Sequence, residues 1–401
     1  MGSLLFEGLK VIDCASFIAA PAAATMLSDF GATVIKIEPP GAGDPFRTLS
    51  ELPGNPKSAH NYAWMLEARN KRSLALDLTS AEGQAVLRHL LVQTDVFITN
   101  FPHAVRRRLG ITYEDLGPLN ARLIYASFSG YGETGAEANK PGFDTNAWWA
   151  RSGLMDVVRA EAQATPARSV PGMGDHPSAV SLYAAIVTAL YRREHTGKGG
   201  HVATSLMANG VWSNGYFVQA RLCGASIEPR PRREHGFNAL TNHYRCSDGR
   251  WLILSLLNEN RQWPVLVSCL GRPELLDDPL FATRPARHAN ARALIAILDE
   301  IFATRDLAEW RRSLDAAGLI FGVVATLDDI AADEQMRVNE VLIEFENDAM
   351  LTINSPLWVE GADKVRPRHP PALGEHSDEI LRGAGYDDAA IQKLRIGGIV
   401  G

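Results

Sequence analysis

One aspartate in the chain stands where a carboxylate could act as a nucleophile. Asp175 lies in the segment PGMGDHP (171–177), directly before a long apolar helical pattern. Proline is favoured at the first helical position, so Pro177 predicts that Asp175 lies at the helix N-terminus. The free N–H groups and the helix dipole at this end favour a negative charge, so we expect an ionised carboxylate. The local sequence alone leaves two interpretations open, a covalent nucleophile or a simple helix cap.

The composition narrows the class of protein. The chain has 401 residues, enough for two or three domains, and 46% of them are hydrophobic. A formal net charge of -6 argues against a broad nucleic-acid surface. We find no apolar run long enough to cross a membrane and no signal peptide. We therefore expect a cytoplasmic protein without membrane or nucleic-acid partners.

The cysteines and histidines give no sign of a metal site. The four cysteines are far apart and show no C-x-x-C spacing; they are Cys14, Cys223, Cys246 and Cys269. The histidines show no metal-ligand spacing with carboxylates or cysteines. We expect free thiols in a reducing compartment and no metal.

Strands and helices alternate in the first half of the chain. The expected strands are Lys10–Ala15, Thr33–Ile37, Leu74–Leu78, Val96–Thr99 and Leu123–Phe128. The expected helices include Ala19–Phe30 and Pro177 to about Glu194. This alternation predicts a parallel sheet covered by helices.

The second half of the chain has a different pattern. The basic, proline-containing segment 228–233 predicts a linker, and hairpins are expected over 244–254 and 342–353 with helices between them. The whole sequence therefore predicts an α/β chain with a second, smaller α+β domain.

Ligands of parallel sheets bind at the carboxyl ends of the strands. Asn100 and Phe101 follow one expected strand, and Ser129, Gly130 and Tyr131 follow another. We expect these residues to lie near a bound ligand.

A set of short motifs runs in order through the whole chain. They are GLKVID (8–13), DFGATVIKIEP (29–39), GDP (43–45), NKRS (70–73) with LDL (76–78), NF (100–101), SGYG (129–132), GD (174–175), TGKG (196–199), DG (248–249) and LGEHS (373–377). Together they resemble, from end to end, the class III CoA-transferases of the CaiB/BaiF, formyl-CoA transferase-like family.

The resemblance implies an architecture. The large domain would be Rossmann-like, formed by residues 1–225 and completed by residues 330–401. The smaller α+β domain would span residues 226–329. Family members form an intertwined homodimer, with each active site between domains of different subunits.

The resemblance also implies roles for individual residues. The catalytic aspartate of the family matches Asp175. The CoA-binding positions match Phe17, Ile18, Ala19, Lys71, Arg72, Asn100, Phe101 and Arg108. Candidate substrate contacts are Tyr131, Glu133, Trp148, Arg151, Gly174 and His176. Lys71, Arg72 and Arg108 could bind the phosphate groups of CoA, although each is equally interpretable as a surface charge.

The implied activity is transfer of CoA from an acyl-CoA to a free carboxylic acid. The aspartate would form first a mixed anhydride and then an aspartyl-CoA thioester. No permanently bound cofactor and no metal would be needed; acyl-CoA and a small acid would be the partners. The segment around Trp148 resembles members that act on dicarboxylates or 2-hydroxy acids, and Arg151 could pair with a second carboxylate or form a structural ion pair.

Some residues depart from the family pattern. NFPHA (100–104) replaces the frequent NFRPG, and Pro39 stands where some members have an arginine. Segment 255–259, SLLNE, lacks the run of glycines found in formyl-CoA transferases, which disfavours formyl or oxalate specificity.

Three alternatives share the fold. An intramolecular CoA-transferase would keep Asp175. A 2-methylacyl-CoA racemase needs two acid/base groups, but Phe143 stands where that subfamily has a histidine. A non-catalytic CoA-binding subunit is disfavoured by the intact Asp175.

Overall fold

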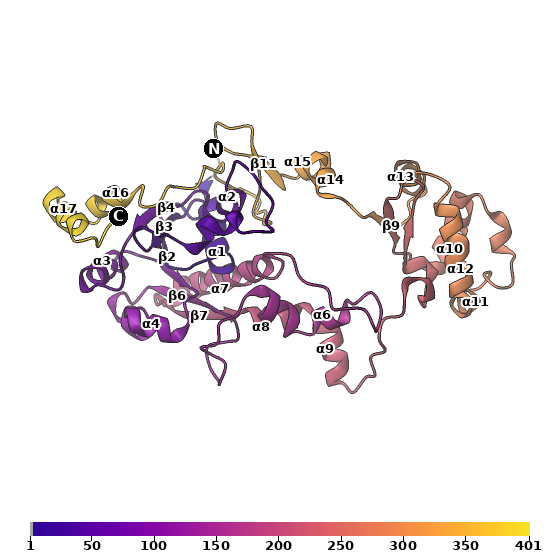
Figure 1. Ribbon diagram of the computed structural model, residues 1–401, viewed down its shortest axis with the longest axis horizontal. Helices are drawn as coiled ribbons and strands as arrows, with labels where there is room; N and C mark the ends of the chain where they lie inside the picture. The colour runs from indigo at the N-terminus through magenta and orange to yellow at the C-terminus, as the bar shows by residue number, and fades with distance from the viewer. Residues whose placement is uncertain (1–2) are drawn as a thin grey trace. The chain divides into compact units, whose positions relative to one another are not determined.

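The computed structural model describes residues 3–401, which form two compact units (Figure 1). The small unit contains residues 226–333 together with 156–167, and the rest of the chain forms the large unit. Residues 156–167, expected in the large domain, therefore group with the small unit. The chain returns to the large unit at residue 334.

The large unit is built on a six-stranded, all-parallel sheet, which confirms the predicted α/β class. Its strand order is β4-β3-β2-β5-β6-β7, the doubly wound Rossmann order. The strands are β2 (Lys10–Asp13), β3 (Thr33–Glu38), β4 (Arg72–Ala75), β5 (Val96–Thr99), β6 (Ile124–Ser129) and β7 (Gly200–Ser205). In this order the connections reverse direction between β2 and β5, and ligands of such sheets bind in the crevice at that point.

Helices cover both faces of the sheet (Figure 1). On one face α1 (Ala19–Asp29) packs against α7 (Asp175–Thr196), and every residue of α1 is buried. On the other face, residues of α3 (Ala81–Leu91), α16 (Ser377–Gly383) and α17 (Asp388–Ile396) share one apolar core with the strands. The C-terminal helices therefore complete the domain that the N-terminal strands begin.

The remaining elements of the large unit are shorter. They are β1 (Ser3–Leu4), α2 (Tyr62–Ala68), α4 (His103–Leu109), α5 (Tyr113–Leu116), α6 (Leu154–Val157, whose last two residues are assigned to the small unit), α8 (Leu206–Ser213), α9 (Gly215–Leu222), α15 (Glu334–Val338), β11 (Leu342–Glu344), β12 (Leu351–Ile353) and β13 (Ala362–Asp363). The hairpin expected over residues 342–353 is confirmed by the antiparallel pair β11–β12.

The small unit has its own core. A three-stranded antiparallel sheet, β10-β9-β8, packs with helices around the fully buried Trp310. Its elements are β8 (His243–Arg245), β9 (Trp251–Leu254), α10 (Glu259–Leu270), α11 (Arg284–Ala289), α12 (Ala291–Phe302), α13 (Leu307–Ala316), β10 (Phe321–Val323) and α14 (Leu327–Ala332). The hairpin expected over residues 244–254 is confirmed, and β10 adds a third strand that was not predicted.

Over residues 3–401, no helix is long and apolar enough to cross a membrane.

Candidate active site

Asp175 is the first residue of helix α7. Pro177 is the third helical residue, so the helix begins two residues earlier than predicted. Gly174 occupies the N-cap position, and no side chain caps the helix. The interpretation of Asp175 as a simple cap is therefore wrong, and its carboxylate is not engaged by its own helix.

The backbone just before Asp175 is held by a second aspartate. The Gly174 N–H donates to Asp144 Oδ2 at 3.2 Å, and Asp144 is buried. Asp144 begins a π-helical segment, η3 (Asp144–Ala150), a rare form of helix that is often found at functional sites. Trp148 of the same segment packs so closely on Gly174 that a Cβ there would lie 2.6 Å from the indole ring. Only glycine fits at this position.

The environment of Asp175 favours its protonated form. Burial, followed by the nearby charge of Asp144, raises the pKa of Asp175 from 3.8 to about 7, and Glu67 adds to this effect. His176 acts in the opposite direction. The helix terminus was expected to keep Asp175 ionised at neutral pH; with a pKa of about 7, the carboxyl group is only partly ionised there, because burial disfavours the charged form.

His176 is held by a buried carboxylate. Its Nε2 lies 2.7 Å from Oε1 of Glu67, a residue of α2 that is only 3% exposed. Burial alone would lower the pKa of His176, but the hydrogen bond and charge of Glu67 raise it above its usual value, with help from Asp175. The raised pKa increases the share of His176 that carries a positive charge beside Asp175.

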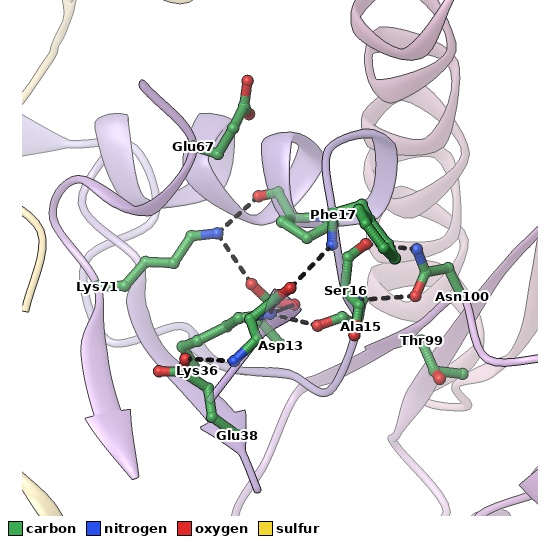
Figure 2. Close-up of polar contacts among 12 residues, drawn as sticks. Asp13, Ala15, Ser16, Phe17, Lys36, Glu38, Glu67, Lys71, Thr99 and Asn100 are labelled. Carbon is green, nitrogen blue, oxygen red and sulfur yellow. Dashed lines mark hydrogen bonds and ion pairs between the residues drawn. The ribbon is translucent and has the colours of Figure 1, made fainter. Parts of the chain in front are cut away.

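The residues predicted to bind CoA after the first strand form the loop between β2 and α1 (Figure 2). Phe17 has a left-handed backbone, with φ of 64°, and its N–H donates to Asp44 Oδ1 at 3.3 Å. Ile18 is the N-cap residue of α1, and Ala19 is its first residue. The N–H groups of a helix's first turn have no partner within the helix, so this terminus suits an anion or a developing oxyanion.

Asn100 spans the point where the strand order reverses. It follows β5, and its side chain bonds the backbone of Ser16 twice, as acceptor at 2.9 Å and as donor at 2.7 Å (Figure 2). Its amide is thus used to fix the β2–α1 loop. Phe101, the next residue, is half-buried and accepts a hydrogen bond from Arg106 through its carbonyl.

The three cations predicted to bind phosphate lie in different surroundings. Lys71 is buried, and its Nζ donates to Asp13 Oδ2 at 2.8 Å and to the Pro21 carbonyl at 2.7 Å (Figure 2). This position does not suit contact with a phosphate. Arg72 lies at the amino end of β4, away from the carboxyl ends of the strands, and pairs with Glu379. Of the three, only Arg108 is exposed on a helix that follows a carboxyl end, namely α4.

Two of the candidate substrate contacts, Glu133 and Tyr131, are fixed by neighbouring side chains. Glu133 accepts from Arg106 at 2.7 Å and from Ser127 at 2.9 Å, so its carboxylate braces the loop that follows β6. Tyr131 is buried, with the ammonium of Lys140 4.8 Å from its ring centroid.

The remaining substrate candidates divide into two groups. Gly174, His176 and Trp148 lie with Asp175, as described above. Arg151 instead pairs with Glu137 at 3.0 Å, and half of its side chain is exposed. The structural interpretation of Arg151 therefore describes this chain better than a role in binding a second carboxylate.

One aromatic contact joins the β2–α1 loop to the segment that supports Asp175. The rings of Phe17 and Phe143 meet edge to face at 5.4 Å, and Phe143 directly precedes Asp144. Asp144 in turn holds Gly174. The predicted CoA-binding loop and the candidate nucleophile are thereby connected through two contacts in series, the Phe17–Phe143 ring contact and the Asp144–Gly174 hydrogen bond.

Comparison with known proteins identifies the family. A model of CoA-transferase family III matches residues 6–377. The chain belongs to this family. The (R)-2-hydroxy-4-methylpentanoate CoA-transferase of Clostridioides difficile is 33% identical over 398 residues, which cover 98% of each chain. The succinyl-CoA:glutarate CoA-transferase of Mus musculus is 30% identical over 98% of this chain and 90% of its own.

A solved structure agrees with this assignment. A CaiB/BaiF family protein from Brucella suis superposes with a TM-score of 0.84 at 29% identity, over 96% of this chain and all of that chain. The protein is therefore a class III CoA-transferase, an enzyme family that uses acyl-CoA as substrate. Among the described residues, no group of histidine, cysteine, aspartate and glutamate could hold a metal ion.

Sequence reasoning missed several residues of this CoA-transferase that support the site. Glu67, Asp144, Lys36 and Asp44 were not singled out. Lys36 and Glu67 lie within apolar segments, and a charge in such a segment is a usable signal, because a buried charge must have a partner. Which partner it has depends on contacts between distant parts of the chain.

Proposed function

We propose that this CoA-transferase moves CoA from an acyl-CoA to a free carboxylic acid with Asp175 as the covalent nucleophile. The observation that carries the proposal is the place of Asp175: a half-buried carboxylate on the first turn of α7, between His176, which Glu67 holds, and a glycine that Trp148 covers. A carboxylate removed from water is a stronger nucleophile than a solvated one, and the surrounding groups set its charge.

Each step exchanges one acyl partner for another. The Asp175 carboxylate attacks the thioester carbonyl, the C–S bond breaks, and the CoA thiolate leaves a mixed anhydride. The thiolate then attacks the aspartyl carbonyl, which gives an aspartyl-CoA thioester and releases the donor acid as its carboxylate. The acceptor carboxylate attacks that thioester, and the returning thiolate takes the acceptor acyl group. Asp175 is regenerated with its electron pair, and no proton is consumed.

For the acid that accepts CoA, we infer a 2-hydroxy acid with an apolar side chain. Trp148 packs on Gly174, the residue before the reacting carboxylate, and the ring of Phe17 contacts Phe143, the residue before Asp144. Arg151, the cation predicted to recognise a second carboxylate, is paired with Glu137. One relative is named for a branched 2-hydroxy acid. A dicarboxylate, as in the name of the mouse relative, is the second candidate.

Replacing the nucleophile tests the mechanism. Asp175→Ala should abolish transfer while the protein stays folded, because the side chain does not cap α7. Asp387→Ala is a matched control: Asp387 caps helix α17 through Ala390 N–H, so its loss should cost about 1 kcal/mol of stability and no activity. Near-normal turnover by Asp175→Ala would exclude the mechanism.

Trapping the intermediate identifies the residue directly. Hydroxylamine or borohydride added during turnover should change the mass of the peptide that contains Asp175 and of no other peptide. The acid is identified by incubating the enzyme with acyl-CoA donors and free acids and detecting new acyl-CoA species by mass spectrometry. A new thioester formed without any added acid would favour the intramolecular transferase.

The racemase alternative makes a separate prediction. A racemase would exchange the α-proton of a 2-methylacyl-CoA with solvent deuterium without an acceptor acid. We expect none above background, because Phe143 cannot carry a proton. Deuterium exchange that Phe143→His accelerates would make Asp175 a general base instead of a nucleophile.

A further inference from the structure

The β2–α1 loop is fixed by three side chains from other elements (Figure 2). The Lys36 ammonium donates to the carbonyl of residue 15, the Asn100 amide bonds residue 16 on both sides, and Asp44 accepts from the N–H of residue 17. Three consecutive backbone residues are thus held by a residue of β3, the residue after β5, and the residue that caps a 3-10 turn. Two of these three partners, Lys36 and Asp44, are buried.

The loop needs this support because its conformation is unfavourable by itself. Phe17 has φ of 64°, a left-handed backbone that non-glycine residues seldom adopt. Such residues persist only where their surroundings enforce them, and they occur often at functional sites. The turn at Phe17 leads directly into α1, so the position of the helix N-terminus depends on it.

Asp44 binds both the loop backbone and a buried lysine. Its Oδ1 accepts from the N–H groups of Phe17 at 3.3 Å and Phe46 at 2.9 Å. Its Oδ2 forms an ion pair with Lys36 Nζ at 2.9 Å, and both side chains are only 1% exposed. Lys36 also pairs more distantly with Asp13. Two carboxylates therefore surround this lysine, and one of them reaches the strained turn.

We propose that Asp44, paired with Lys36, is a positioning residue that holds the β2–α1 loop in the conformation that binds CoA. The proposal rests on the proposed function, since it takes the loop to be part of the acyl-CoA site. The partners of Asp44 are Lys36, Glu38 and the backbone of Phe17 and Phe46, so we expect it to act through the Phe17 backbone and the α1 terminus. Its effect should therefore appear in CoA affinity, not in the chemistry of bound substrate.

Asp44→Asn is the first test. Asparagine has one acceptor oxygen, so it cannot serve both Lys36 and the two backbone N–H groups. If the loop then adopts the binding conformation about a tenth of the time, the dissociation constant of CoA rises about tenfold. Isothermal titration with coenzyme A itself measures this constant. At saturating acyl-CoA, kcat should stay within about twofold of normal, because saturating substrate restores the binding conformation.

Asp95→Asn is the matched control. Like Asp44, Asp95 links a buried cation to the backbone: it pairs with Arg193 at 2.9 Å and accepts a hydrogen bond from the Lys10 N–H. Asp95 lies, however, at the amino end of the strands of the same sheet. This variant should lose thermal stability without changing CoA affinity. If Asp44→Asn behaves like Asp95→Asn, with a lower melting temperature and an unchanged dissociation constant, Asp44 is merely structural and the proposal is overturned.

A second variant, which keeps the buried charge, tests the proposal in case Asp44→Asn does not fold. Asp44→Glu keeps the charge beside Lys36 but moves the carboxylate by one methylene, away from the geometry that the Phe17 N–H requires. We expect a folded protein with weakened CoA binding and near-normal kcat. Normal CoA affinity in this folded variant would also overturn the proposal.

Failure of the proposed function gives a different result. If the unmodified protein does not bind coenzyme A, or if Asp175→Ala retains transferase activity, the site or the mechanism is wrong whatever Asp44 does. If the unmodified protein binds CoA and needs Asp175, an unchanged affinity in the Asp44 variants refutes the positioning role alone.

Discussion

At the scale of single residues, the protonation of Asp175 decides when the enzyme can work. Only the carboxylate attacks a thioester, and burial with Asp144 nearby raises the pKa of Asp175 to about 7. An ordinary aspartate would be ionised far below that pH. The site thus gains a desolvated nucleophile but loses activity in mildly acidic solution.

We predict that kcat/KM for acyl-CoA rises with pH and reaches half of its plateau near pH 7, since kcat/KM reports the free enzyme. Asp144→Asn should move this midpoint to lower pH, because it removes a negative charge that raises the pKa of Asp175 while leaving an oxygen for the Gly174 N–H. A midpoint that does not move in Asp144→Asn would contradict the assigned electrostatics. Initial rates across pH 5–9 measure both.

The same pKa predicts a stability effect. An acid whose pKa is raised on folding destabilises the folded state once it is ionised. This cost is absent below the ordinary pKa of 3.8, grows as pH rises toward about 7, and is constant above it. Asp175→Asn should therefore melt at a higher temperature than the unmodified protein at pH 8, and the difference should shrink as pH falls toward 4. A difference independent of pH would show that Asp175 keeps an ordinary pKa.

At this scale the sequence pointed to Asp175, the proposed nucleophile, but not to the residues around it. Asp175 and Gly174 are close in the chain and carry a local pattern. Glu67 and Asp144 reach the site only through the packing of α2 and η3, so no local pattern announces them. The buried position of Lys71 could not be predicted for a related reason: its partner, Asp13, is 58 residues away in the sequence. For Arg151, which the sequence left open between a substrate contact and a structural ion pair, the structure shows an ion pair with Glu137.

At the scale of elements, the segment that carries Asp144 and Trp148 is held by close packing against α8. A Cβ on Gly210 of α8 would lie 2.3 Å from the carbonyl oxygen of Trp148. Backbone atoms cannot yield as a flexible side chain can, so the two segments would have to separate. The position of η3, and with it the support of Asp175, therefore depends on one missing methyl group.

We predict that Gly210→Ala destabilises the protein by about 1–3 kcal/mol and lowers kcat, because it displaces η3. Gly215→Ala is the control: it lies at the start of α9 with open space around its would-be Cβ, so stability and kcat should be normal or slightly improved. Thermal unfolding and initial rates of both variants test this. Equal behaviour of the two alanine variants would be the contradicting result.

The elements that the sequence predicted best are the buried ones. Val96–Thr99 was predicted to the residue, because a fully buried strand is a continuous apolar run. The edge strand β7, which alternates half-buried and exposed residues, was missed behind the glycine-rich turn. Helix α7 was predicted two residues short at each end. Proline and glycine indicate roughly where a helix begins and ends, but the exact end residues depend on backbone geometry.

At the scale of the whole molecule, apolar side chains remain uncovered on α8 and α9. Trp212 is 87% exposed, Tyr216 84% and Leu222 75%. Large exposed apolar patches mark interaction surfaces. A cavity of about 1240 Å³ within the large unit is bordered by another exposed indole, that of Trp358. We propose that this chain forms the intertwined homodimer that the resemblance implies, and that these surfaces are covered in it.

We predict a dimer in sedimentation equilibrium at micromolar concentration. Trp212→Glu should weaken it, because a charge would enter an apolar contact, whereas Leu52→Glu, at an exposed leucine outside α8 and α9, should not. Because the proposed dimer would place each active site between subunits, the dissociated variant should also lose activity. A monomeric unmodified protein with full activity would refute the proposed dimer.

The edge of the sheet at β4 has a consequence for how the molecule is made. Val400 bridges Leu76, the Gly401 N–H donates to the Ala75 carbonyl, and Gly374 donates to Ser73 from 301 residues further along the chain. A ribosome that adds about 5–20 residues per second needs tens of seconds to cover that distance. During this time the outer strand of a nascent half-sheet has no covering segment, and unpaired strand edges recruit other chains. Expression at low temperature with chaperones, which protects such nascent edges, should therefore raise the soluble yield of this enzyme more than it would for a domain built from one continuous stretch.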